Sequence, residues 1–225
     1  MSTVKSSQLA AKKIFIVEDH PAFREGLVQI INTEEGLSVC GEAGDAETAL
    51  IEIPRVKPDL VLVDITLPGK SGLELIREIR SVNQTIKLLV VSMHDESVYA
   101  NRVLRAGGDG YIMKQEDPSE LVNAIHDVLD GHIYVSEEVM ASGILSSAPP
   151  KKSADPIDQL SDSELEILEM LGRGKANEEI AANLDLELSV VKNGCTALKN
   201  KLNLKSDNAL IRYAVCWVEN DGSDS

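Results

Sequence analysis

Five short apolar runs alternate with helical patterns along roughly the first 130 residues of the chain. The runs are four to seven residues long and cover 13–17, 37–40, 60–63, 86–92 and 109–113. Apolar residues recur every three or four positions, as on one helix face, in segments at 21–31, 46–56, 73–79, 96–106 and 118–128. Parallel strands need a connecting helix, so this alternation predicts an α/β fold. We expect a doubly wound parallel sheet with helices on both faces.

The pattern changes near residue 146. The segment 146–156 contains two adjacent prolines among small polar residues, a composition typical of linkers. After this segment, apolar residues recur only at helical spacing. The first helix would be capped by Ser161 and Glu164 and would end at glycines 172 and 174. Further helices are expected at 178–184, which Asn177 would cap, and at 188–202 and 208–219.

Two of these helices are short and joined by a tight turn, and the second helix carries lysines. This arrangement is typical of a helix-turn-helix. The chain is therefore expected to have three parts. They are a domain at 1–132, a linker at 133–156 with room for a short helix, and a small all-α domain at 157–221.

The amino-acid composition excludes several classes of protein. Hydrophobic residues make up 43% of the 225 residues, enough for packed cores. Three cysteines without a CxxC pair exclude a disulfide scaffold and a cysteine-based zinc site, and they favour a reducing compartment. No stretch approaches the roughly 18 apolar residues of a membrane span. We therefore expect a soluble cytoplasmic protein with no membrane partner.

The net charge of −15 leaves no global positive field that would attract nucleic acid. One local patch differs, because residues 188–206 contain no acidic residue and four lysines. Any nucleic-acid binding is therefore expected at this patch.

Polar side chains follow four of the predicted strands. Glu18 and Asp19 end the first, Asp64 ends the third, Ser92 ends the fourth and Lys114 ends the fifth. The carboxyl ends of parallel strands form one edge of a sheet, where ligands bind, so these side chains should converge. A single strand-end aspartate is usually a turn residue or helix cap, and it is the convergence that favours chemistry here.

Three crowded carboxylates repel each other unless a cation lies between them, and all-oxygen ligands suit Mg²⁺. Lys114 adds a positive charge and Ser92 a hydroxyl donor. A carboxylate with a metal, an ammonium group and a hydroxyl around it can receive a phosphoryl group.

Residues 13–131 resemble the receiver domain of two-component response regulators. The matching motifs are Val-Glu18-Asp19-His-Pro, Val-Asp64-Ile-Thr-Leu-Pro-Gly, Val-Val-Ser92-Met-His and Gly-Tyr111-Ile-Met-Lys114. The resemblance implies a flavodoxin-like (βα)5 fold in which Asp64 accepts a phosphoryl group from a phosphohistidine of a sensor histidine kinase. Such a domain slowly dephosphorylates itself and is not a turnover enzyme.

The resemblance also implies roles for the neighbours of Asp64. Glu18, Asp19, Asp64 and the backbone carbonyl of Thr66 would hold Mg²⁺. Lys114 and Ser92 would bind the phosphoryl group. Tyr111 would turn inward behind Ser92 as the second switch residue, although simple packing of this side chain is an open alternative. Thr66 and His94 flank the position where receivers tune the lifetime of the acyl phosphate.

Residues 157–220 resemble the LuxR-type helix-turn-helix of NarL/FixJ regulators. The resemblance rests on Leu160-Ser-Asp-Ser-Glu-Leu-Glu-Ile-Leu168, Gly174-Lys-Ala-Asn-Glu-Glu-Ile-Ala181, Val191-Lys-Asn193 and Lys201-Leu-Asn-Leu-Lys-Ser206. It implies that the helix at 188–202 enters the major groove of double-stranded DNA and that dimers bind inverted half-sites. The expected DNA contacts are Lys192, Asn193, Thr196 and Lys199 on the outward face, with Lys201 and Lys205 nearer the DNA backbone.

Four residues depart from that family pattern: Glu187, Val190, Gly194 and Cys195. Glu187 would repel phosphate, and a glycine inside a helix costs about 1 kcal/mol relative to alanine. Two alternatives therefore stay open for this half: a solvated lysine face, and a degenerate helix-turn-helix that binds protein under phosphorylation control. The last helix, with Leu210, Ala214 and Trp217 on one face, would either pair with a second copy or pack against its own domain.

Overall fold

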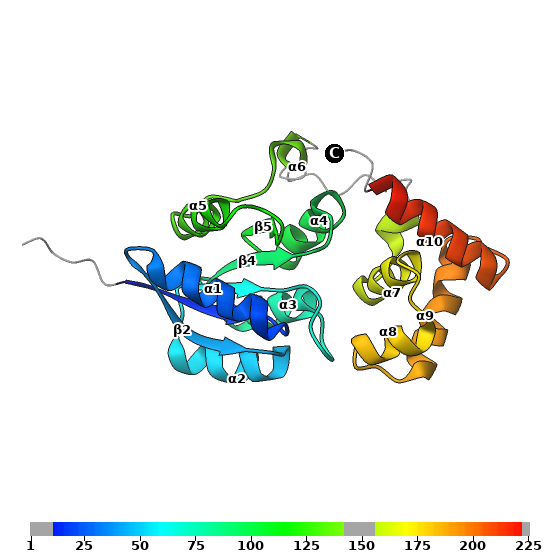
Figure 1. The fold of residues 1–225 in the computed structure, drawn as a ribbon, viewed down its shortest axis with the longest axis horizontal. Coiled ribbons are helices and arrows are strands. Elements are labelled where there is room, and N and C mark those ends of the chain that lie inside the picture. The colour runs from blue at the N-terminus through cyan, green and yellow to red at the C-terminus, as the bar shows by residue number, and fades with distance from the viewer. Residues whose placement is uncertain (1–10, 142–155, 222–225) are drawn as a thin grey trace, which may run out of the picture. The chain divides into compact units, whose positions relative to one another are not determined.

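The computed structural model describes residues 11–141 and 156–221, which fold as two compact units. The first unit is an α/β domain and the second is entirely helical (Figure 1). Of the expected linker at 133–156, residues 142–155 lie outside the described residues. Among those described, no helix has both the length and the apolar character needed to cross a membrane.

The first unit is built on a five-stranded parallel sheet in the order β2-β1-β3-β4-β5. The strands are β1 (Lys12–Val17), β2 (Leu37–Ala43), β3 (Leu60–Val63), β4 (Lys87–Ser92) and β5 (Gly110–Met113). The helices between and after them are α1 (Pro21–Thr33), α2 (Ala46–Val56), α3 (Gly72–Val82), α4 (Glu96–Ala106) and α5 (Pro118–Leu129). The doubly wound topology predicted from the hydrophobic pattern is confirmed.

Alternate residues of each strand face opposite helical layers. Ile14 and Ile16 of β1 share a core with Leu27 of α1 and Ile125 of α5. Helices α1 and α5 contact each other over this core, while α2, α3 and α4 contact one another in turn (Figure 1). Because both faces are covered, the central strand β3 is apolar throughout, and all four of its residues are buried.

The first unit continues past residue 132. Tyr134 pairs with the free edge of β5: its carbonyl accepts from the Tyr111 N–H at 2.7 Å, and its own N–H donates to the Asp109 carbonyl at 3.1 Å. The short helix α6 (Glu137–Ala141) contacts α4, and Val139 is buried. The expected boundary at residue 132 therefore falls too early, because residues 133–141 cover the edge of the sheet.

The second unit contains a 3-10 turn (Pro156–Gln159) and helices α7 (Asp162–Gly172), α8 (Asn177–Asn183), α9 (Leu188–Lys201) and α10 (Asp207–Asp221). The predicted capping box is present, because the Glu164 N–H donates to Ser161 Oγ and the Ser161 N–H donates to the Glu164 carboxylate. The cap of α8 is Ala176, one residue before the expected Asn177. Gly174 follows α7 with a positive φ of 78°, which a glycine adopts without strain.

The apolar face of α10 packs inside its own unit. Leu210 and Ala214 are almost fully buried, and α10 contacts α7 along its length. A Cβ on Gly172 of α7 would overlap the backbone carbonyl oxygen of Ala214, so the two helices touch at their backbones. Leu210 and Ala214 therefore pack against their own domain, whereas Trp217 is only half-buried and pairing of two copies through α10 stays a prediction.

Candidate functional site

The predicted acidic side chains meet at the carboxyl ends of β1 and β3. Val17 pairs with Val63, so the residues that follow these strands leave the sheet side by side. Glu18 and Asp64 are buried, with exposures of 1% and 4%. Ligand atoms of Glu18, Asp19, His20 and Asp64 all lie within 4.8 Å of one another. The sheet register therefore forms a compact carboxylate site.

Lys114 joins this site from the end of β5. Its Nζ lies 2.7 Å from a Glu18 carboxylate oxygen and 2.8 Å from Asp64 Oδ2, with only 6% of the side chain exposed. The Phe23 ring of α1 lies 4.7 Å from the same nitrogen. A buried ammonium held by two carboxylates and a ring face has a defined position, so Lys114 lies within reach of a group bound to Asp64.

Burial and the closeness of charged groups shift the pKa values of the site residues. Burial raises the pKa of Asp64. The pKa of Glu18 is raised by burial and by the nearby charge of Asp64. For Lys114, burial opposes the charged form, but the two carboxylates outweigh it and the pKa is raised. Since Asp19 adds a third carboxylate, the site has more negative charge than one ammonium can balance.

The donor set fits a hard divalent cation. Glu18, Asp19 and Asp64 offer oxygen ligands in one cluster, and a cation there would offset the charge that Lys114 leaves unbalanced. His20 lies at the edge of the cluster, where its Nδ1 contacts Asp19 Oδ1 at 2.7 Å. These residues could hold Mg²⁺.

Ser92 and Tyr111 lie on the neighbouring strands β4 and β5 and are both buried. Ser92 ends β4, where its Oγ accepts a hydrogen bond from the His94 N–H at 3.3 Å. The Tyr111 hydroxyl donates to the His94 carbonyl at 2.7 Å. Tyr111 is thus tied to the loop that follows Ser92.

His94 is more central than the sequence indicated. Its Nε2 lies 2.7 Å from Thr66 Oγ1, which links the loop after β4 to the loop after β3. Its ring stacks on Tyr99 of α4, with centroids 4.6 Å apart. Tyr99 was not predicted as part of this arrangement, because its only signal in the sequence was an aromatic residue five positions after a histidine.

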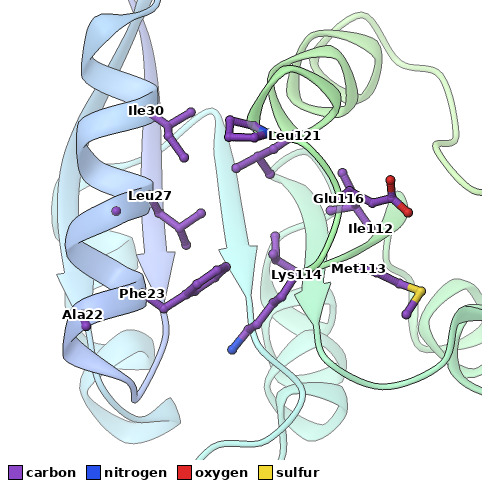
Figure 2. A pocket seen from close by; sticks show the side chains of 12 residues that line it. Ala22, Phe23, Leu27, Ile30, Ile112, Met113, Lys114, Glu116 and Leu121 are labelled. Carbon is purple, nitrogen blue, oxygen red and sulfur yellow. The ribbon is translucent and has the colours of Figure 1, made fainter.

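An apolar cavity adjoins the charged site between α1, β5 and α5. Phe23, Leu27 and Ile30 of α1 line one wall, and Leu121 of α5 faces them (Figure 2). Lys114 points its nitrogen toward the Phe23 end of this cavity. The sequence analysis did not find this surface, because its residues also follow the pattern of an ordinary core.

The lysines of the patch in the second unit differ in whether they form an ion pair among the described residues. Lys192 on α9 and Lys205 beyond it are exposed, as are Asn193 and Thr196 of α9. Lys199 lies 2.6 Å from Asp207 Oδ1.

Lys201 faces its own unit. Its Nζ contacts a Glu164 carboxylate oxygen at 2.6 Å and the Gln159 carbonyl at 3.2 Å. Lys201 was expected near a DNA backbone, and its side chain stays 38% exposed although it is paired with the capping carboxylate of α7.

Two of the four atypical residues pack inside the unit. A Cβ on Gly194 would lie 2.6 Å from Ile167 Cδ1, so the glycine lets α9 approach α7 closely. Cys195 is buried, and its thiol contacts Asn177 Oδ1 at 3.6 Å. Glu187 is the N-cap of α9 but makes no side-chain cap, and Val190 is 47% exposed. Gly194 and Cys195 therefore belong to the packing of the unit.

Both units match known protein families. Residues 14–126 match the response regulator receiver domain, and residues 158–214 match the bacterial regulatory proteins of the luxR family. The chain belongs to the response regulators. Its two units are a receiver and a LuxR-type helix-turn-helix domain.

Known response regulators resemble this one over nearly its whole length. The response regulator UvrY of Escherichia coli K12 is 32% identical over 210 residues, which cover 92% of this chain and 96% of UvrY. The oxygen regulatory protein NreC of Staphylococcus aureus MRSA252 is 34% identical over 209 residues, with coverages of 90% and 96%.

Two solved structures have related folds. A LuxR-family two-component response regulator from Aurantimonas is 37% identical, with a TM-score of 0.56 over 59% of this chain and 94% of that one. RcsB of Salmonella enterica bound to promoter rprA has a TM-score of 0.63 at 23% identity, covering 91% of this chain and 98% of RcsB.

Proposed function

We propose that this response regulator accepts a phosphoryl group on Asp64 from a sensor histidine kinase in a Mg²⁺-dependent reaction, and that phosphorylation controls DNA binding by the helix-turn-helix domain to regulate transcription. The observation that carries the proposal is the contact of the buried Asp64 carboxylate with Lys114 inside a cluster of further carboxylates. This arrangement supplies a nucleophile together with charge that can stabilise a phosphoryl group.

The proposed transfer begins when an Asp64 carboxylate oxygen attacks the phosphorus of the kinase phosphohistidine. A P–O bond forms as the P–N bond breaks, and the histidine nitrogen leaves with the electron pair. Lys114 moves its hydrogen bond from the carboxylate to a phosphoryl oxygen, where it balances the developing charge. Glu18, Asp19, Asp64 and the Thr66 carbonyl would hold Mg²⁺, which when bound offsets the charge of the phosphoryl oxygens.

Ser92 and Tyr111 are proposed to convert phosphorylation into a change of shape. The Ser92 hydroxyl would donate to a phosphoryl oxygen, moving the loop that carries His94. The Tyr111 hydroxyl bonds to the carbonyl of His94, so its side chain would follow that loop. The protein acts in this scheme as a switch that slowly loses its phosphoryl group, not as a turnover enzyme.

Asp64 can be tested as the acceptor with acetyl phosphate and Mg²⁺. We expect one phosphoryl group per chain by intact mass spectrometry and none in D64N or after chelation of Mg²⁺. The matched control is D127N, which removes a carboxylate of α5 and should be labelled normally. Stoichiometric labelling of D64N would contradict the assignment.

DNA binding is proposed for α9 and for Lys205, which follows it. Lys192, Asn193 and Thr196 are exposed and available to base edges or phosphates. Electrophoretic mobility shift at low and high salt tests this. We expect K192A and K205A to weaken binding, whereas K201A should chiefly lower the melting temperature of the domain because it breaks the contact with Glu164.

The competing hypothesis is a phosphorylation-controlled module that binds protein through the same helices. The luxR-family match favours the DNA-binding interpretation. Absence of a shift even at low salt, in the phosphorylated protein, would leave only this alternative. We also propose that the protein acts in the cytoplasm. Phosphorylated chains would pair into a homodimer on inverted half-sites of the DNA.

A further inference from the structure

One exposed acidic residue interrupts the lysine surface of α9. Asp207 is the first residue of α10, and its Oδ1 accepts from Lys199 Nζ at 2.6 Å. The side chain of Asp207 is 78% exposed and that of Lys199 is 24% exposed. Asp207 is not needed as the cap of α10, because Ser206 Oγ accepts from the Ala209 N–H at 3.2 Å. Its carboxylate is therefore committed chiefly to Lys199.

The ion pair lies in a hollow that also contains residues proposed to face DNA. Lys192, Thr196, Lys199 and Asp207 all line this hollow between α9 and α10. A duplex placed against Lys192 and Thr196 would therefore bring a backbone phosphate close to Lys199. The carboxylate of Asp207 already accepts a hydrogen bond from the ammonium group that such a phosphate would contact.

We propose that Asp207 competes with a DNA phosphate for Lys199 and so limits the affinity of this domain for DNA. This inference rests on the proposed DNA-binding function. A carboxylate and a phosphodiester are both anionic acceptors of the same ammonium hydrogen bond. An exposed ion pair is weak enough to open, so the phosphate can displace the carboxylate, but it must first compete with it. The displaced carboxylate then lies beside the DNA backbone and repels it.

The other lysines of the patch differ from Lys199. Lys201 is paired with Glu164, a largely buried carboxylate of the α7 capping box, so that pair is part of the domain's framework. Lys192 and Lys205 show no ion pair within the described residues. Lys199 is thus the lysine whose availability depends on a single exposed carboxylate.

The test uses the full-length chain and D207N. Asparagine keeps the size of the side chain but removes its charge, so it should release Lys199. Binding to a fluorescein-labelled duplex of mixed sequence, about 25 base pairs long, is followed by anisotropy between roughly 50 and 200 mM KCl, with Mg²⁺ and acetyl phosphate present. We expect D207N to bind about threefold to tenfold more tightly at the lowest salt. The slope of log K against log salt should steepen by about 0.9, as for one added phosphate contact.

A double-mutant cycle separates competition from a general effect of charge. K199A should weaken binding more in the D207N background than in the background that retains Asp207. The control D185N removes an equal charge from an exposed turn residue whose positive φ asparagine also tolerates. Its effect should be smaller than that of D207N and additive with K199A.

The outcomes distinguish this inference from the proposed function. Binding by the unsubstituted chain that D207N leaves unchanged would overturn the competition and leave DNA binding in place. Additive effects of K199A and D207N would also overturn it. Failure of every variant to bind at the lowest salt would overturn both.

Discussion

The carboxylates around Lys114 determine the chemistry of the receiver at the scale of single residues. Their types and strand-end positions were predicted from the sequence, but the sharing of one ammonium by Glu18 and Asp64 was not. That sharing depends on how far the side chains extend between the ends of β1, β3 and β5. The same limit explains why the ion pair of Lys201 was not predicted, since its partner Glu164 lies 37 positions away in the chain.

Substitution of Asp64 by asparagine is expected to stabilise the receiver in the absence of Mg²⁺. Burial raises the pKa of Asp64, so ionisation of this group in the folded state is unfavourable. Below the ordinary pKa of the carboxyl, near 3.8, the group is protonated in both the folded and the unfolded chain, and the folded state keeps its full stability. This stability is lost as the pH rises through the raised pKa of Asp64 in the folded state. D64N should therefore be more stable than the unsubstituted chain near neutral pH, with a higher Tm, and should gain nothing below the ordinary pKa of the carboxyl.

Thermal denaturation at a neutral and an acidic pH measures this gain, with D127N as the control. Added Mg²⁺ should stabilise the unsubstituted chain more than D64N. Equal melting temperatures of D64N and the unsubstituted chain at neutral pH without Mg²⁺ would contradict the expectation.

At the scale of elements, the junction between β3 and α3 positions Asp64. Ser71 and Glu74 form a capping box at the start of α3, a signal in the sequence that the analysis did not use. The N–H of Gly72 donates to the Ile65 carbonyl at 2.8 Å, which draws the start of the helix against the strand end. A Cβ on Gly72 would overlap the carbonyl oxygen of Asp64. The sequence predicted the helix but not this backbone contact.

Replacement of Gly72 by alanine should destabilise the receiver and disturb the site. The overlap is with backbone, which cannot rotate away, so we expect a loss of about 3 kcal/mol in the free energy of unfolding. The matched variant is G26A, because Gly26 lies inside α1, where an added Cβ would have no atom within 4 Å. G26A should gain about 0.5 to 1 kcal/mol from helix propensity. Urea denaturation measures both, and equal stability of the two variants would contradict the explanation.

At the scale of the whole molecule, the chain forms two units whose cores are separate. The receiver core lies on both faces of a parallel sheet, and the second core lies among α7, α8, α9 and α10. The receiver also includes the segment after α5, which completes the sheet edge through Tyr134 and buries Val139 against α4. The N–H of Ser136 donates to a Glu96 carboxylate oxygen at 2.7 Å, which ties this segment to the start of α4.

Truncation tests the position of the receiver boundary. A fragment ending at residue 132 should be less stable than one ending at residue 142 by about 3 kcal/mol. The estimate combines two backbone hydrogen bonds of Tyr134, each worth about 1 kcal/mol, with the burial of Val139. Urea denaturation of the two fragments provides the measurement. Equal midpoints and slopes would show that residues 133–141 contribute nothing to the fold.

The sequence by itself determined the order of strands and helices, the division into two domains and the residue types at the strand ends. These features depend on local periodicity, and Glu18, Asp64 and Lys114 follow strands whose apolar runs are unmistakable. Only the tertiary structure decided which charges neutralise each other, as in the pairs Lys199–Asp207 and Lys201–Glu164. The reason is physical: an ion pair or a backbone contact depends on distances between segments, and local periodicity carries no information about them.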